Sequence, residues 1–468
     1  TVLYVYCDGG NLYADVDAAA LFGSVRARQL PLDVSPEAVS HFLTCGLIPF
    51  PKSICRQVSA LGIGDRLHVT HAGGQWLCRY ELEFPYFSER SSEANQPDAT
   101  RLQSLLTHAI ETSVDGMESP TLMLSSGKDS TALAVCLAEL GRRDVNALTF
   151  VAETDVDEDD YARSVCDRFG FTHRRVCVPQ KQPFPSGVLD QFFQSAPLPC
   201  ADDCQIPYVY AMSEASEAGC ILDGSGSDIY VGHVPSLNDR RRERIRVRSR
   251  VFAHLLESVA PCCTRPAQLL RNDAELCFLL GLFRGREVRR FFSGYESTDP
   301  FWSAAVAPLR GRDVFDFRAV VRGRYYDQGS CALKVMTAAA AFGRSCALPW
   351  CDDGVIDYYF NLPRDARYDS RRFVNKLLVR DMLHNAVEYP DAEIGKRYFQ
   401  FDRISFFLAN EYRVRSEILE CSYWDTGASA QLLNTLFARL PRNNRVGVAL
   451  NAWFLLSGWL NHNQWVGV

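Results

Sequence analysis

The residues with the clearest capacity for chemistry lie in a Ser/Gly turn at positions 125–130, between an apolar run of strand length and a helical pattern. Such a turn offers unpaired backbone N–H groups and the positive end of a helix dipole, which together favour a bound phosphate. Gly127 has no Cβ, so the backbone can approach the anion. Lys128 adds positive charge, and Asp129 can hold Mg²⁺ against the same phosphates. The spacing is not the Walker pattern, but the turn predicts a phosphate site. The alternative is a polar helix cap without a ligand.

A second turn of this type follows the apolar residues at 221–222 and runs through positions 223–228. It also ends in an aspartate, Asp228. Because the carboxyl ends of neighbouring parallel strands meet at one edge of a sheet, Asp129 and Asp228 are expected to lie close together. Two carboxylates can share Mg²⁺ around one triphosphate, since this ion needs only hard oxygen ligands and an open geometry. Asp129 and Asp228 are therefore the predicted metal ligands.

Both turns resemble motifs of the asparagine synthetase superfamily. The first is similar to its pyrophosphate loop, Ser-Gly-Gly-x-Asp-Ser, with Ser126 in place of the first glycine. The second is similar to Ser-Gly-Glu-Gly-Ser-Asp-Glu of asparagine synthetases, and Ser227-Asp228-Ile229 matches β-lactam synthetases more closely. The resemblance implies ATP and Mg²⁺ as cofactors and catalytic roles for Lys128, Asp129 and Asp228. The residues implied to contact the nucleotide are Met123, Leu124, Ser125, Ser126, Gly127, Lys128, Asp129, Ser130, Val151, Asp223 and Gly224.

Ser225 departs from the family pattern. Asparagine synthetases have a glutamate at this position, and β-lactam synthetases have the tyrosine of a catalytic dyad. A serine without an activating partner is a poor general base. The nucleophile must therefore lose its proton to another group or to the substrate, or this step does not take place.

A lysine loop near the C-terminal third completes the implied site. The segment Ile394-Gly395-Lys396-Arg397-Tyr398-Phe399 resembles the family's Arg-x-Lys-x-x-Phe. In β-lactam and carbapenam synthetases, a lysine at this place stabilises charge in the amide-forming step. The resemblance therefore implies a catalytic role for Lys396, with Arg397 as the nearest alternative. The simpler interpretation is a solvated loop lysine. Just before this loop, residues 374–380 match the family's Lys-x-x-Leu-Arg helix.

Alternating strands and helices are expected to position these turns. Strand patterns occur at 121–124, 145–151 and 174–178, with helical patterns between them, and the chain is mainly helical from about residue 251. This order predicts an α/β fold with a doubly wound parallel sheet. The resemblance, which extends over residues 35–462, implies the adenine-nucleotide α-hydrolase type with a helical C-terminal part.

The first 90 residues predict a small β-rich domain. Residues 1 to about 30 are predicted to form β-structure with a hairpin turn at Asp8-Gly9-Gly10, and a helix follows from Ser35. This stretch resembles the end of a glutaminase domain, whose nucleophile is an N-terminal cysteine. Here the chain starts with Thr1, which is an alternative nucleophile, and the first cysteine is Cys7. We predict a truncated, inactive glutaminase-like domain at 1–90, and a synthetase domain at 91–468 that begins in a polar linker.

Composition excludes several classes of function. A net charge of −6 argues against a general nucleic-acid binder. No apolar run approaches membrane-spanning length and no signal peptide is evident, so we expect no membrane partner. The 17 cysteines include no CxxC pair, which indicates reduced core thiols in a cytoplasmic protein. The basic cluster at 240–250 is either a solvated helix face, a surface for an acidic peptide or carrier, or a source of pyrophosphate contacts.

These features together predict an ATP-dependent amide or lactam synthetase, as in β-lactam, carbapenam and lasso-peptide macrolactam formation. A substrate carboxylate is adenylated, pyrophosphate leaves, and an amine captures the acyl-AMP. The expected partners are a small-molecule or peptide carboxylate and amine, with a homodimer or a biosynthetic protein as the macromolecular partner. The first alternative is asparagine-type amidation with free ammonia or a partner glutaminase. The second is a nucleotide-binding pseudo-enzyme. Related tRNA-modifying enzymes usually have a basic surface and paired cysteines. The sequence has neither feature, which argues against that class.

Overall fold

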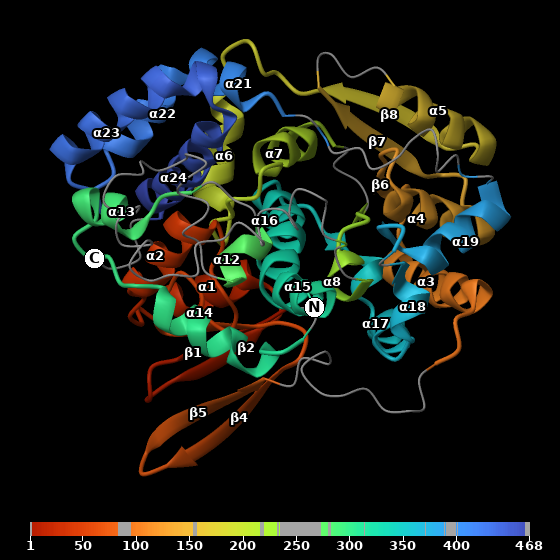
Figure 1. Ribbon diagram of the computed structural model, residues 1–468, viewed down its shortest axis with the longest axis horizontal. Coiled ribbons are helices and arrows are strands. Elements are labelled where there is room, and N and C mark those ends of the chain that lie inside the picture. Colours follow the sequence, from red (N-terminus) through yellow and green to blue (C-terminus); the bar gives the residue numbers. More distant parts are fainter. Residues whose placement is uncertain are drawn as a thin grey trace.

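In the computed structural model of the chain, both turns follow the carboxyl ends of strands in a five-stranded parallel sheet (Figure 1). The structure describes residues 2–82, 95–152, 157–215, 220–231, 234, 273–278, 282–312, 314–369, 371–387, 389, 399 and 401–463. The strands are β6 (Thr121–Met123), β7 (Asn146–Val151), β8 (Thr172–Cys177), β9 (Ile221–Leu222) and β10 (Cys346–Ala347). Their order in the sheet is β10-β9-β6-β7-β8.

The order of the strands reverses beside β6. The chain runs outward from β6 through β7 to β8 and then returns to β9, which pairs with the other side of β6. Thr121 is in register with Ile221, and Leu122 with Leu222. The two turns therefore leave the sheet side by side, at the topological switch point where open α/β sheets bind ligands. The predicted doubly wound parallel sheet is confirmed.

Two groups of helices pack around this sheet (Figure 1). The first group contains α3 (Ala99–Val114), α4 (Lys128–Glu139) and α19 (Leu377–Val387), which contact one another. The second contains α6 (Ser186–Ser195), α7 (Gln205–Glu214) and α16 (Leu333–Ala341). Strands β7 and β8 contact α5 (Asp157–Phe169). Helices α4 and α5 are the connections between consecutive parallel strands, as in other doubly wound folds.

The C-terminal part is helical, as predicted. Its helices are α21 (Arg403–Ala409), α22 (Glu411–Leu419), α23 (Thr426–Arg439) and α24 (Asn444–His462). Most of α24 is buried, including two tryptophans, because the other C-terminal helices and the earlier helices α2 and α6 pack around it. The other elements after β9 are α8 (Asp228–Val231), α12 (Asp273–Phe278), α13 (Gly285–Phe291), α14 (Asp299–Val306), η1 (Ala307–Leu309), α15 (Val314–Val321), η2 (Arg322–Ala332), η3 (Pro349–Cys351), α17 (Asp353–Phe360), α18 (Arg364–Arg367), β11 (Tyr368–Asp369), β12 (Val374–Asn375) and η4 (Leu440–Arg442).

Residues 2–82, which we call the N-terminal unit, combine strands and helices. Strands β1 (Leu3–Cys7), β2 (Leu12–Asp15) and β3 (Val58–Leu61) form an antiparallel sheet, with α1 (Ala18–Ala27) and α2 (Pro36–Cys45) beside it. A hairpin of β4 (Asp65–Ala72) and β5 (Gln75–Leu82) extends from it (Figure 1). The prediction of β-structure up to about residue 30 is wrong for α1. The Asp17 carboxylate caps this helix, and Leu21, Phe22 and Val25 bury one side of it.

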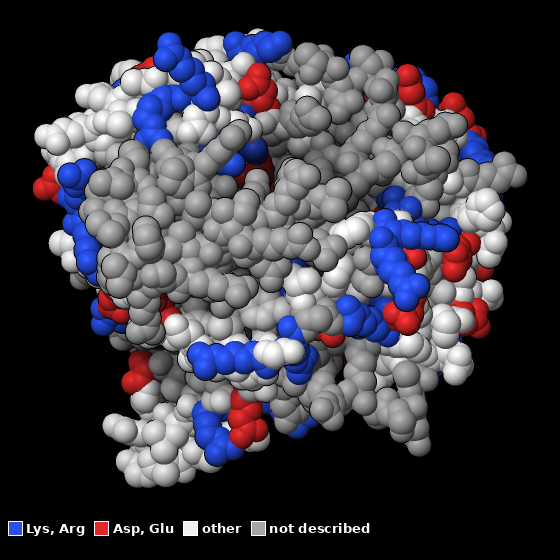
Figure 2. All heavy atoms as spheres, in the orientation of Figure 1, with Lys and Arg blue, Asp and Glu red and all other residues white. Residues whose placement is uncertain are grey.

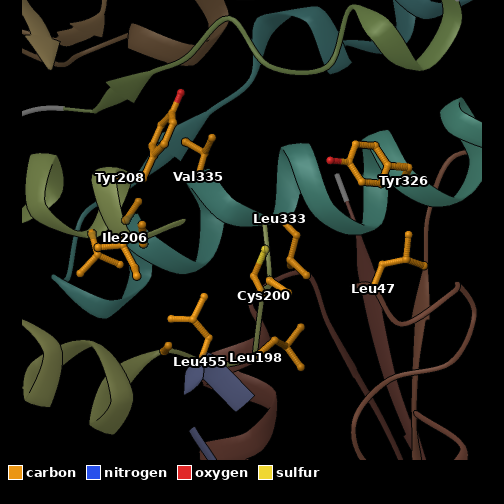
Figure 3. Close-up of a cluster of buried hydrophobic side chains, with 14 of the residues drawn as sticks. Leu47, Leu198, Cys200, Ile206, Tyr208, Tyr326, Leu333, Val335 and Leu455 are labelled. Atoms are coloured by element: carbon orange, nitrogen blue, oxygen red, sulfur yellow. The ribbon is translucent and has the colours of Figure 1, made fainter. Parts of the chain in front are cut away.

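The N-terminal unit and the rest of the chain share one hydrophobic core. Figure 3 shows Leu47 of the N-terminal unit in the same buried cluster as Leu198, Cys200 and Leu333 of the later chain. All four are buried. The predicted domain boundary near residue 90 and most of the predicted linker fall in 83–94, outside the described residues. Packing thus joins the two predicted domains.

Positive and negative side chains are intermixed over the described surface that Figure 2 shows. No helix among the described residues combines the length and the apolar character needed to span a membrane. The basic cluster at 240–250 lies outside the described residues.

Candidate functional site

The first turn is held in shape by its own hydroxyl groups. The Ser125 N–H donates to Ser130 Oγ over 3.1 Å, and the Gly127 N–H donates to Ser125 Oγ over 3.1 Å. The backbone of Leu124 is anchored to β7 by a 3.0 Å hydrogen bond from its N–H to the Leu148 carbonyl. Asp129 follows in the first turn of α4. The loop is therefore fixed between a buried strand and the positive end of a helix, where phosphate binds with little reorganisation.

The two turns touch backbone to backbone at Gly224. A Cβ at this position would lie 2.8 Å from the Ser130 nitrogen and 3.0 Å from the Asp129 carbonyl carbon. Neither backbone atom can move away without displacing the start of α4. Only glycine allows this approach, which brings Asp228, at the start of α8, toward Asp129.

Asp129 and Asp228 meet on one ammonium group, that of Lys376. Its Nζ lies 2.5 Å from Asp129 Oδ2 and 3.0 Å from Asp228 Oδ1. The hydroxyl of Ser227 accepts from Lys376 Nζ at 3.0 Å and donates to Asp129 Oδ1 at 2.8 Å. Burial lowers the pKa of Lys376, but the two carboxylates outweigh it and raise that pKa above its ordinary value. Lys376 is therefore a fixed positive charge. The structure brings both predicted metal ligands together.

Lys376 is not among the site residues predicted from the sequence. It lies between β12 and α19 with a left-handed backbone, at φ 58°, a region that residues with a side chain rarely adopt. Strained backbone of this kind often occurs at functional sites, where packing holds it in place. The available signal was the match of 374–380 to the family's Lys-x-x-Leu-Arg helix, which assigns the lysine no role.

Lys128 extends over an aromatic ring from a distant segment. Its Nζ lies 5.1 Å from the ring centroid of Tyr389, a cation–π distance. The Tyr389 hydroxyl donates to the Ser126 carbonyl over 2.6 Å. Tyr389 therefore supports the phosphate loop and positions the Lys128 side chain. No local pattern in the sequence indicates this residue.

Asp223 lies under the second turn as a buried carboxylate. Its Oδ2 accepts from the Tyr208 hydroxyl at 2.8 Å, and its Oδ1 accepts from the Ser225 N–H at 2.7 Å. Burial, with the Asp223 charge beside it, raises the pKa of Tyr208 well above its ordinary value, so the phenol keeps its proton. This places a phenol–carboxylate pair next to Ser225, the position that departs from the family pattern.

The other predicted residues are distributed as follows. Met123 and Val151 are buried at the carboxyl ends of β6 and β7, beside the turns. Lys396 and its alternative Arg397 lie outside the described residues. Phe399, three residues after Lys396, is described, and its ring lies 5.0 Å from that of Phe150 in β7. Phe399 thus lies near the carboxyl end of β7, beside the turns.

The donor set fits Mg²⁺ bound together with a nucleotide. The side chains of Asp129 and Asp228 remain 24 % and 31 % exposed, so a ligand can reach their oxygens. Among the described residues, no group of three or more His, Cys, Asp and Glu side chains could enclose a metal. Mg²⁺ usually takes one or two carboxylates and completes its shell with phosphates and water. Two converging carboxylates beside a phosphate loop match that preference.

Comparison with known protein families gives a match over most of the chain. The model of the family described as asparagine synthase matches residues 101–438. This range includes both turns, Lys376 and the lysine loop. A search of curated proteins finds no match. The matched family has the adenine-nucleotide α-hydrolase fold that the resemblance implies.

Proposed function

Because the chain belongs to the asparagine synthase family, whose members are ATP-dependent ligases that form C–N bonds, we propose that it joins a carboxylate to an amine through an acyl-adenylate. The observation that carries the proposal is the convergence of Asp129, Asp228 and Lys376 beside the phosphate loop. Two carboxylates and a fixed ammonium, at a helix N-terminus, provide a site for a triphosphate with a metal ion.

In the first step, the substrate carboxylate attacks the α-phosphate of ATP and pyrophosphate leaves. Negative charge grows on the pyrophosphate oxygens as the bond breaks. Lys128, Lys376 and the N–H groups at the start of α4 stabilise that charge more in the transition state than in the ground state. Mg²⁺, when bound by Asp129 and Asp228, neutralises further charge on the phosphate oxygens. Lys376 keeps its proton and acts through its charge.

In the second step, an amine attacks the acyl carbonyl and AMP leaves, which gives an amide or a lactam. We assign the stabilisation of this step to Lys396, with Arg397 next in line. The contact between Phe399 and Phe150 supports this assignment, because it places Phe399, three residues after Lys396, beside strand β7. Ser225 is unsuited to accept the amine proton. The proton therefore passes to another group or to the substrate.

The N-terminal unit does not, in this proposal, supply ammonia from glutamine. Cys7 is at the end of β1, and its thiol donates to the Trp76 carbonyl at 3.7 Å, in contact with the hairpin. An amine substrate, small or peptidic, is then the nitrogen source. This favours amide or lactam synthesis over asparagine-type amidation, the alternative in which free ammonia or a partner glutaminase provides the nitrogen.

ATP–pyrophosphate exchange tests the proposal. Purified protein is incubated with ATP, Mg²⁺, labelled pyrophosphate and pools of carboxylic acids or peptides, and AMP is measured after amines are added. We expect exchange with one class of acid and AMP release with its amine. AMP release with ammonium alone would favour the amidation alternative. Nucleotide binding with no exchange over any pool would favour the pseudo-enzyme.

A further inference from the structure

A π-helix contacts both the candidate site and the N-terminal unit. This element, η2, is π-helical over Arg322–Ala332. π-Helical backbone is rare and often marks functional sites. All but one of its residues are buried, and they include Arg322, Arg324 and Asp327. A segment with so many buried charges is stable only where specific partners hold it.

On one side, η2 supports the residue that follows Asp228. A Cβ added at Gly323 would overlap the carbonyl oxygen of Ile229, so the backbones of η2 and α8 are in direct contact. The position of η2 therefore determines where α8, and with it the Asp228 carboxylate, lies relative to Asp129.

On the other side, η2 is bonded to the base of the hairpin in the N-terminal unit. Arg324 Nη2 lies 2.5 Å from Asp65 Oδ1, and the two side chains are only 1 % and 4 % exposed. The Ile63 N–H donates to Gln328 Oε1 over 2.7 Å. The Gln328 amide then donates to the carbonyls of Gly323 and Arg324. The N-terminal unit thus holds the same stretch of η2 that touches α8.

We propose that the N-terminal unit positions Asp228 for nucleotide binding, with Gly62, Asp65 and Ile63 acting through η2 as positioning residues. The inference rests on the proposed function, and it gives a role to a segment that the mechanism does not otherwise use. Gly62 is at the contact itself, since an added Cβ would overlap Gln328 Oε1 and lie 2.7 Å from the Phe50 ring. A methyl group there is a wedge between the N-terminal unit and η2.

The test measures binding of a non-hydrolysable ATP analogue to the full chain by calorimetry, at a series of Mg²⁺ concentrations. The variants are Gly62→Ala, which inserts the wedge, and Asp65→Asn, which removes the charge but keeps the side-chain volume. We expect both to weaken Mg²⁺-dependent binding by about tenfold or more, the effect usual for losing a residue that positions a metal ligand. Amide exchange of residues 228–231 should also become faster, while that of α24 stays unchanged.

Two control variants separate positioning from general stability. Gly23→Ala places a methyl group in open space in the same unit. Arg413→Met removes the ion pairs that this α22 residue makes with Asp190 of α6 and Glu417 of α22. We expect the second to lower the melting temperature and both to leave nucleotide affinity unchanged. If the Gly62→Ala and Asp65→Asn proteins fold and bind the ATP analogue with wild-type affinity, the inference is overturned. If Gly62→Ala does not fold, the affinity of Asp65→Asn alone decides. A wild-type protein that does not bind the analogue would instead overturn the proposed function.

Discussion

At the scale of single residues, the site is a balance of charges. Asp129 and Asp228 share the ammonium of Lys376, so each carboxylate lies within hydrogen-bond distance of the same positive charge. The cluster therefore carries one net negative charge. A divalent cation and a polyphosphate can bind beside it together. Each member is therefore expected to matter for the nucleotide step and little for the fold.

Replacing either carboxylate by an amide should remove this step. We expect Asp129→Asn and Asp228→Asn each to reduce ATP–pyrophosphate exchange by about 100-fold or more, the range for losing one preorganised charge in a closed site. Circular dichroism and the melting temperature should stay close to those of the wild type. A variant with near wild-type exchange would show that the metal is held elsewhere.

The two lysines should separate the two half-reactions. Lys376→Met should lower exchange and product formation together, by about 100-fold, because its charge acts on the phosphates (about 3 kcal/mol). Lys396→Ala should lower product formation by a similar factor while exchange largely survives. Both rates are measured with the true substrate. If Lys396→Ala lowers both, that lysine belongs to nucleotide binding; if it lowers neither, Arg397 is the next residue to replace.

His41 makes stability depend on pH. Its ring is fully buried in α2, against Phe301 and Trp302, and burial lowers its pKa from 6.5 to about 3. Below pH 6.5 the unfolded chain takes up a proton that the folded chain cannot, so folding becomes less favourable as the pH falls toward 3. At pH 5.5 the free energy of unfolding is lower by about 1.4 kcal/mol. Urea unfolding at pH 7.5 and 5.5 should show this difference for the wild type and not for His41→Phe. If His41→Phe loses the same free energy of unfolding between these pH values, other groups cause the pH dependence. His108→Gln, at an exposed histidine, is the control.

At the scale of elements, the site depends on how closely two turns approach. Strands β6 and β9 are adjacent and in register, so their turns leave the sheet together. The close contact at Gly224 then sets the separation between α4 and α8. The elements therefore act as a rigid frame, and a small change in their contact alters the positions of both aspartates.

A methyl group at Gly224 should disturb this frame. We expect Gly224→Ala to destabilise the fold by about 1–3 kcal/mol, the usual cost of overpacking, and to weaken nucleotide binding. The matched control is Gly187→Ala in α6, where an added Cβ meets open space. Denaturant unfolding and calorimetric titration of both variants provide the comparison. Equal behaviour of the two would mean that the turns tolerate a wider separation.

At the scale of the whole molecule, the N-terminal unit is part of the structure of the synthetase. Its core is continuous with that of the later chain, and buried Asp65 pairs with Arg324 across the boundary. Removing one partner of a buried ion pair is costly, typically about 3–5 kcal/mol. A unit attached in this way is suited to support the site even if it has no catalytic activity of its own.

The proposed absence of glutaminase activity has a direct assay. Pure protein incubated with glutamine should release no glutamate above background, because Cys7 is a residue of strand β1 and its thiol contacts the Trp76 carbonyl. Adding ATP and the carboxylate substrate should not change this result. Glutamate release that disappears in Thr1→Ala or Cys7→Ala would show that the N-terminal unit is active.

The sequence by itself determined the parallel sheet, the two turns and the pairing of Asp129 with Asp228. These depend on local patterns, an apolar strand followed by a Gly/Ser turn and a helix, which short-range sterics and hydrogen bonding impose wherever the chain lies. Local patterns were also misjudged once, at α1, where the Asp17 cap outweighed the preceding strand pattern.

Only the tertiary structure decided which groups complete the site. Lys376 is 247 residues from Asp129, and Tyr389 is 263 residues from Ser126. Contacts over such separations arise when helices pack on the sheet, and nothing in the neighbouring sequence of either partner encodes them. The same is true of Asp65 and Arg324, which meet only because the N-terminal unit packs against η2 and buries both side chains.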